Sequence, residues 1–166
     1  PIPRWDLLDL RKYHSPGIQY SRGCPKDCEF CDITKLFGRE PRTKTPQQMI
    51  SELDAVYNAG HRGNVMIVDD NIIGNKRNLK ELLPEMIAWQ QEKKYPFSFF
   101  TEASMDLAWE TNNDILEGLS KAGFSQIFMG IESLDKEVLE KTNKKQNTVM
   151  PQLEAVKKIQ SAGIEV

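Results

Sequence analysis

The chain has 166 residues, of which 39% are hydrophobic and 28% are charged, a balance typical of a globular domain with one core. Its net charge of −2 predicts no nucleic-acid binding, because nucleic-acid-binding domains carry an excess of basic residues. No apolar run approaches the roughly 20 residues that cross a bilayer, and the N-terminal residues lack the pattern of a signal peptide. We therefore expect a cytoplasmic protein whose thiols stay reduced.

Apolar runs at intervals along the chain predict a series of β-strands. The run at residues 65–68 is apolar on successive positions, which is typical of a strand buried on both faces of its sheet. In chain order, the predicted strands are residues 17–21, 65–68, 97–101, 126–129 and 164–166. Because the chain starts at Pro1 without an initiator methionine and ends within the fifth strand, we expect it to be a piece of a longer protein.

Helix signals occupy the segments between the predicted strands. One helix is predicted to begin after Thr45, which forms a capping box with Gln48, and to end at Gly60. A second covers residues 79–87, where Pro84 is expected to kink or restart it. Three further helices are predicted at residues 113–121, 133–140 and 151–162.

Strands that alternate with helices predict an α/β fold with parallel strands and right-handed crossovers. An open doubly wound sheet and an arc of a βα barrel both fit this order. Polar residues follow each of the first four strands, and a barrel gathers such loops at one site, whereas an open sheet has a single switch point. We therefore predict a partial (βα) barrel of the TIM-like type, truncated at about its fifth strand. Residues 1–16 are predicted as a lead-in segment and residues 17–166 as the N-terminal part of the barrel.

The three cysteines lie within eight positions, in the segment YSRGCPKDCEFCD at residues 20–32. An odd number of cysteines in one short loop supplies no disulfide framework, so metal ligation is the hypothesis to test. A [4Fe-4S] cluster with three cysteine ligands leaves one iron open to a substrate or cofactor. Zinc is the alternative, although His14 and His61 are not at a ligand-like spacing from the cysteines. Three unligated thiols fit a loop with this many charged residues less well.

Several motifs together resemble the radical S-adenosylmethionine (radical SAM) superfamily. The spacing Cys-x3-Cys-x2-Cys, with Phe30 before the last cysteine, directly follows the first strand of the βα repeat. The segments YSRGCPKDCEFC, VDDNIIGN, TEAS, AGF and MGIES extend the resemblance over nearly the whole chain. The chain is most similar to the radical SAM cores found beside a cobalamin-binding domain. The run at residues 144–147 also follows the family pattern, with no role implied for it.

The resemblance implies a [4Fe-4S] cluster held by Cys24, Cys28 and Cys31. The open iron of that cluster would chelate the amino and carboxylate groups of S-adenosylmethionine. The backbone around Phe30 would meet the adenine, although this side chain could also serve only as a hydrophobic anchor for the loop.

Polar residues at the later strand ends would contact the same cofactor. Asp69, Asp70 and Asn71 occupy the place of the family's Gly-Gly-Glu segment, which accepts hydrogen bonds from the methionyl ammonium group. The glycines are missing here, and these three residues could simply end a strand and begin a turn. Glu132 and Ser133 would correspond to the ribose-contacting motif, or Ser133 could cap the following helix.

Glu102 and Ser104 stand where contacts to cofactor or substrate could arise. A cofactor with a sulfonium and an ammonium group favours a site with carboxylates nearby, and Asp69, Asp70, Glu102 and Glu132 are all predicted at one face. The residues that follow the strands therefore agree with the cofactor that the resemblance implies.

The implied activity is reductive cleavage of S-adenosylmethionine to a 5′-deoxyadenosyl radical, and methyl transfer is the subtype that the resemblance favours. Cobalamin in the full-length protein, a low-potential electron donor and an unknown substrate are the implied partners. Methylthiolation or another radical reaction is an alternative, and so is a zinc-binding interaction module. The piece by itself is expected to be inactive and to self-associate through its exposed barrel edges.

Overall fold

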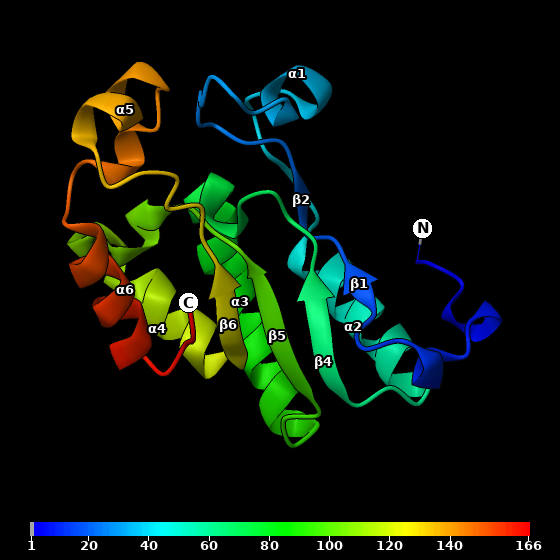
Figure 1. Ribbon diagram of the computed structural model, residues 1–166. Helices are drawn as coiled ribbons and strands as arrows, with labels where there is room; N and C mark the ends of the chain where they lie inside the picture. Colours follow the sequence, from blue (N-terminus) through cyan, green and yellow to red (C-terminus); the bar gives the residue numbers. More distant parts are fainter. Residues whose placement is uncertain (1) are drawn as a thin grey trace.

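The computed structural model describes residues 2–166 and contains a four-stranded parallel sheet (Figure 1). The strands lie in the order β1-β4-β5-β6, and each pairs in parallel with the next. The predicted fifth strand is represented by a parallel bridge between Gln126 and Glu165. The bounds are β1 Gly17–Ile18, β4 Gly63–Ile67, β5 Phe97–Glu102 and β6 Phe124–Phe128. Every predicted strand is therefore found, and the first is shorter than predicted.

Helices α2, α3 and α4 cover one face of this sheet (Figure 1). The middle helix α3 packs against both α2 and α4, so the helices follow the same order as the strands. A doubly wound sheet places helices on both faces, whereas a barrel keeps them all outside. The prediction of a partial βα barrel is thus confirmed. The helix bounds are α2 Pro46–Asn58, α3 Lys76–Glu92, α4 Asn113–Lys121, α5 Lys136–Lys141 and α6 Gln152–Ser161.

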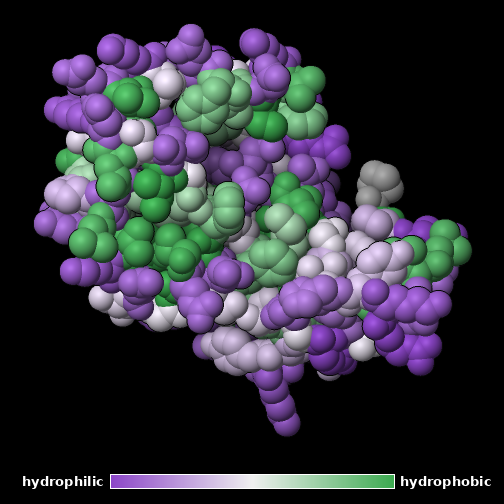
Figure 2. Space-filling view, viewed as in Figure 1, coloured by the Kyte–Doolittle hydropathy of each residue, from purple (hydrophilic) through white to green (hydrophobic). Residues whose placement is uncertain are grey.

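The other face of the sheet, which corresponds to the inside of a barrel, lies open in the described residues. Side chains along β5 alternate between buried and half-buried, so only one face packs into the core. Val68 and Phe128, at the ends of their strands, are exposed. Figure 2 shows hydrophobic side chains gathered on the viewer's side of the molecule, over the sheet. The prediction that residues 65–68 are buried on both faces is wrong for this chain, because no described element covers the inner face.

Local signals placed most helix ends correctly. Thr45 and Gln48 form both hydrogen bonds of the predicted capping box. Pro84 lies inside α3, which runs unbroken through it, so of the two predicted effects the restart is wrong, and the kink stays a prediction. Packing of the apolar face of α3 against the sheet outweighs the backbone hydrogen bond that proline removes. Helix α5 begins later than predicted because Asp135 caps it, accepting hydrogen bonds from the backbone of residues 137 and 138.

A small antiparallel hairpin frames the cysteine loop and was not predicted. Strand β2, Ser21–Arg22, pairs with β3, Arg42–Thr43, and the helix α1, Ile33–Phe37, lies between them. The remaining short elements are single 3₁₀ turns: η1 Trp5–Leu7, η2 Leu10–Lys12, η3 Ile72–Asn75, η4 Met105–Ala108, η5 Glu110–Asn112 and η6 Lys145–Asn147. None of the helices described between residues 2 and 166 is long and apolar enough to cross a membrane.

Candidate cofactor site at the carboxyl ends of the strands

A cavity of about 290 Å³ lies at the carboxyl ends of the strands, where four βα loops meet. The cysteine loop beside it lies above the upper end of the sheet in Figure 1. All the predicted site residues except Asp69 and Ser133 line it: Cys24, Cys28, Phe30, Cys31, Asp70, Asn71, Glu102, Ser104 and Glu132. A larger groove of about 870 Å³ beside β1 contains none of the predicted residues. The fold therefore brings most of the predicted site together in one place.

The cysteine loop is held by its own backbone. Gly23 has φ +102°, and a side chain there would collide with the carbonyl oxygen of Gly38 across the loop. The amide of Cys24 donates to that same carbonyl at 3.3 Å, and the amide of Cys31 donates to the carbonyl of Cys28 at 3.1 Å. A glycine at position 23 is thus required for the loop to close and for the cysteines to face the cavity.

The three thiols are free and partly exposed, as ligands of a bound group must be. Between residues 2 and 166, no three His, Cys, Asp or Glu side chains are gathered as ligands of one metal ion. Thiolates around a single zinc ion converge on bonds of about 2.3 Å, whereas the cysteines of a cubane each bind a separate iron and stand farther apart. Three soft sulfur ligands around one cavity fit an iron–sulfur cluster. Burial raises the pKa of the Cys24 thiol.

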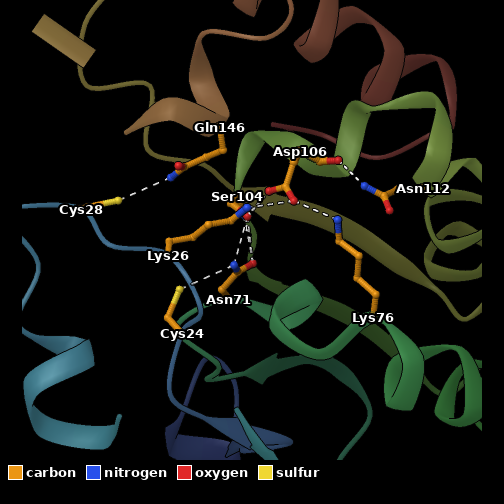
Figure 3. Close-up of polar contacts among 9 residues, drawn as sticks. All are labelled: Cys24, Lys26, Cys28, Asn71, Lys76, Ser104, Asp106, Asn112 and Gln146. Atoms are coloured by element: carbon orange, nitrogen blue, oxygen red, sulfur yellow. Dashed lines mark hydrogen bonds and ion pairs between the residues drawn. The ribbon is translucent and has the colours of Figure 1, made fainter. Parts of the chain in front are cut away.

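A polar network supports the loop from behind (Figure 3). Asn71 holds Ser104 by three contacts: its Nδ2 lies 3.0 Å from Ser104 Oγ, and its Oδ1 accepts from the Ser104 amide at 3.1 Å and lies 3.3 Å from the hydroxyl. The same Nδ2 lies 3.7 Å from Cys24 Sγ. Ser104 also donates to the buried carboxylate of Asp106. Asn71 therefore connects a cysteine to the turn that follows β5.

Asp106 anchors the cysteine loop through Lys26. The ammonium groups of Lys26 and Lys76 each lie 3.0 Å from the same carboxylate oxygen. Burial opposes ionisation of Asp106, but the hydrogen bond from Ser104 and these two charges hold the pKa of its carboxyl below the usual value. Sequence analysis missed Asp106 and Lys26, because neither follows a strand directly and their contact joins distant parts of the chain.

Replacing Asp106 with alanine is expected to loosen the cysteine loop. Removing one partner of a fully buried ion pair costs about 3–5 kcal/mol. Lys26 and Lys76 keep some contact with water, so we expect about 2 kcal/mol here. Hydrogen exchange across residues 24–31 should quicken accordingly. Asp114→Ala, which removes an exposed ion pair with Lys80 on the outer helices, should leave that exchange unchanged; equal exchange in both variants would contradict the anchoring role.

Two carboxylates face the cavity without a cationic partner in the described residues. Asp70 Oδ2 is buried and has no hydrogen-bond partner there. Burial and the charge of Asp70 raise the pKa of Glu102 on the neighbouring strand. A buried carboxylate oxygen without a partner is costly unless a ligand satisfies it, so this corner of the cavity is suited to a cationic group.

Glu132 lies across the cavity and is paired. Its carboxylate is 2.7 Å from the ammonium group of Lys144, which lies 5.5 Å from the centre of the Phe30 ring. Glu132 has a left-handed backbone, with φ +62°, which is strained for a side chain other than glycine. The Glu132 carboxylate fills the space beside Gly130, so a side chain at position 130 would collide with it. Lys144 thus links the fourth loop to the cysteine loop, a role that sequence analysis did not assign.

Asp69 and Ser133 lie outside the cavity. Asp69 is fully buried and accepts hydrogen bonds from the amides of Tyr20 and Ser21, at 2.7 and 2.8 Å, and from the Ser21 hydroxyl. Ser133 Oγ accepts from the amide of Asp135 just before α5. The cofactor contacts predicted for both stay untested, while the structure gives Asp69 a task in holding the strand that leads to the cysteines.

Comparison with known proteins adds to this geometry. The family model of the radical SAM superfamily matches residues 18–166, which include every residue that lines the cavity. The chain belongs to the radical SAM superfamily. Relatives of this radical SAM chain include an uncharacterized methyltransferase of Synechocystis sp., 52% identical over 99% of this chain and 30% of its own length. The hopanoid C-2 methylase of Rhodopseudomonas palustris is 45% identical over the whole chain and 31% of its own length.

Solved radical SAM structures share the fold at low sequence identity. The methyltransferase TsrM from Kitasatospora setae, with tryptophan and a SAM analogue bound, aligns with a TM-score of 0.76 and 16% identity over 93% of this chain and 30% of its own. The cobalamin-dependent enzyme OxsB aligns with a TM-score of 0.76 and 19% identity over 99% of this chain and 25% of its own. The radical SAM chain described here spans about 30% of the length of the curated relatives.

Proposed function

We propose that this chain is part of a radical SAM enzyme that cleaves S-adenosylmethionine reductively at a [4Fe-4S] cluster held by Cys24, Cys28 and Cys31. The observation that carries the proposal is the meeting of three free thiols in one cavity with Asp70, whose buried Oδ2 has no hydrogen-bond partner in the described residues. When bound, the cluster would supply the electron that breaks the sulfonium bond to C5′ and releases methionine and a 5′-deoxyadenosyl radical.

The residues of the cavity have separate tasks in this proposal. Asp70 and Glu102 would attract the positive groups of S-adenosylmethionine, because two carboxylates in a half-buried site favour a cation strongly. Phe30, with its ring exposed at the rim, would exclude water from the adenine. Glu132 would accept from the ribose hydroxyls while Lys144 holds its carboxylate in place. Asn71 and the Ser104 hydroxyl would fix the edge of the site next to Cys24.

Methyl transfer is the subtype we propose for the full-length protein. Two relatives that match essentially all of this chain carry the names methyltransferase and methylase. A cobalamin cofactor in the full-length protein belongs to this proposal, since one structure of TsrM has cobalamin bound and OxsB is cobalamin-dependent. Methylthiolation is the alternative, because a putative methylthiotransferase of Methanocaldococcus jannaschii is 26% identical over 90% of this chain.

Further parts of the proposal concern the setting of the enzyme. We propose that residues 1–16 lead into the barrel and that residues 17–166 form its N-terminal part; Pro1 lies outside the described residues. A low-potential electron donor, a cytoplasmic location and no nucleic-acid partner complete the proposal. Taken alone, this chain would self-associate through its exposed barrel edges, above all through β1, which pairs with β4 on one side only; the outer side of β6 is already bridged to Glu165.

Anaerobic reconstitution of the full-length protein with iron and sulfide tests the proposal. Low-temperature electron paramagnetic resonance of the reduced protein should give a [4Fe-4S] signal that shifts when S-adenosylmethionine is added. The assay should also yield 5′-deoxyadenosine. Stoichiometric zinc with no cluster signal would overturn the proposal and favour a zinc-binding module.

Asp70→Asn should keep the cluster signal but weaken the response to S-adenosylmethionine. The variant removes a carboxylate charge from the cavity, and we expect affinity to fall about tenfold, the effect of roughly 1.4 kcal/mol. The dissociation constant can be read from the signal shift. Glu117→Gln, which neutralises an exposed carboxylate of α4 paired with Lys121, is the matched control and should bind S-adenosylmethionine as the wild type does.

A further inference from the structure

Gln146 lies on η6 and points its side-chain amide at Cys28, 118 residues away in the sequence (Figure 3). The amide nitrogen Nε2 is 3.4 Å from Cys28 Sγ. Gln146 is 7% exposed, so water competes little for this donor. The contact comes from the run at residues 144–147, for which the sequence implied no role.

The segment that carries Gln146 is fixed to the site on both sides. The carbonyl oxygen of Thr142 accepts from the amide of Glu29, next to Cys28, at 3.0 Å. On the other side, Asn147 is buried and donates to the carbonyl of Gly130 at 2.9 Å and to that of Ile131 at 3.1 Å. Gln146 is therefore held against the cysteine loop by contacts that do not depend on its own side chain.

The contact to Cys28 is the shorter of the two side-chain amide contacts to a cysteine sulfur in the described residues. Asn71 Nδ2 lies 3.7 Å from Cys24 Sγ, and the same nitrogen lies 3.0 Å from Ser104 Oγ. Gln146 Nε2 has its contact with Cys28 alone among the described residues. An N–H aimed at a ligand sulfur from a buried position is one of the levers by which a protein sets the reduction potential of an iron–sulfur centre.

We propose that Gln146 is a positioning residue that makes the cluster easier to reduce by donating its N–H to the sulfur of Cys28. The inference rests on the proposed function, since it requires the cluster. Reduction adds one negative charge to the thiolate-ligated centre, and a hydrogen bond to a more negative sulfur is stronger. The donor therefore stabilises the reduced state more than the oxidised one and raises the potential.

The test is a redox titration of the reconstituted full-length protein. The electron paramagnetic resonance signal of the reduced cluster is measured at each potential. Gln146→Met keeps the length of the side chain and removes the donor. We expect the equilibrium constant for reduction to fall about threefold to tenfold, where tenfold corresponds to about 59 mV for a one-electron couple. Gln146→Glu places a carboxylate at the same distance, and the potential should fall further.

Gln152→Met is the matched control, because Gln152 donates to the backbone of Ser133 at 2.8 Å and touches no cysteine. It should titrate as the wild type does. A cluster that forms in Gln146→Met with the wild-type potential would overturn the role of Gln146 and leave the proposed function standing. A wild-type protein that takes up no cluster would overturn both. If Gln146→Met lost the cluster, the titration of Gln146→Glu would decide, since a wild-type potential there also contradicts the role.

Discussion

Replacing Cys28 with alanine in the full-length protein is expected to abolish the cluster and, with it, the cleavage of S-adenosylmethionine. These 166 residues contain three cysteines, all in one loop, so no other thiolate of this chain can take the place of the lost ligand. Two ligands would leave two irons of the cubane open to solvent. After anaerobic reconstitution, the iron and sulfide contents of the variant should fall to background. The electron paramagnetic resonance signal of the reduced protein should be lost as well. The same loss is expected for Cys24→Ala and Cys31→Ala.

A neighbour in the same loop provides the control for this loss. Lys35 lies on α1 between the cysteines and β3, is exposed, and has Asp32 as its one ion-pair partner among the residues that the structure describes. Lys35→Ala should therefore keep the iron content, the signal and the cleavage of the wild type. Retention of a full cluster by Cys28→Ala would mean that this thiol is not a ligand. It would also remove the basis for the role of Gln146.

The strands and the position of the site were predictable from the sequence because both depend on local patterns. Residues at the carboxyl ends of parallel strands must meet at one end of the sheet, so the order of the strands alone places Cys24, Asp70 and Glu102 together. The choice of a barrel over an open sheet rested on the same argument, and the helices on one face of the sheet agree with it. Capping at Thr45 was also a local signal.

The contacts that support the site could not be predicted in this way. Cys28 and Gln146 are separated by 118 residues, and no local pattern shows that their side chains meet. The hairpin of β2 and β3 has two residues in each strand, too few for a periodicity to appear. In the run Asp69-Asp70-Asn71, successive side chains point in different directions after the strand. Asp70 therefore faces the cavity while Asp69 turns into the core.

Replacing Asp69 with alanine is expected to destabilise the strand that leads to the cysteines. Asp69 is 1% exposed and accepts from two amides and one hydroxyl, at Tyr20 and Ser21. Each buried donor left without an acceptor costs about 1 kcal/mol or more, so we expect a loss of about 3 kcal/mol in the free energy of local opening. Amide hydrogen exchange of the peptide that contains residues 17–23 measures this loss in the free energy of local opening. Asp54→Ala, which removes the acceptor of the Trp89 indole between α2 and α3, is a control for general loosening and should leave this peptide protected.

The stability that depends on Asp69 should also change with pH in a defined direction. Burial raises the pKa of Asp69 to about 6 in spite of its three hydrogen bonds, against an ordinary value of 3.8. The folded state therefore holds this proton more tightly than the unfolded state, and its contribution is full below about pH 4 and is lost as the pH rises through about 6. From pH 5 to pH 7, the free energy of local opening should fall by about 1 kcal/mol in the wild type.

Asp69→Asn separates this effect from other titrating groups. The amide cannot ionise, so the fall between pH 5 and pH 7 should be smaller in the variant by about the same 1 kcal/mol, after correction for intrinsic exchange rates. An equal fall in both proteins would mean that Asp69 stays ionised throughout this range, held as an anion by Tyr20 and Ser21. A larger fall in the free energy of local opening in the wild type alone would show that Asp69 titrates in this range, directly behind the cysteine loop. Loss of the bound cluster at rising pH would then have a structural cause that is separate from the cysteine ligands.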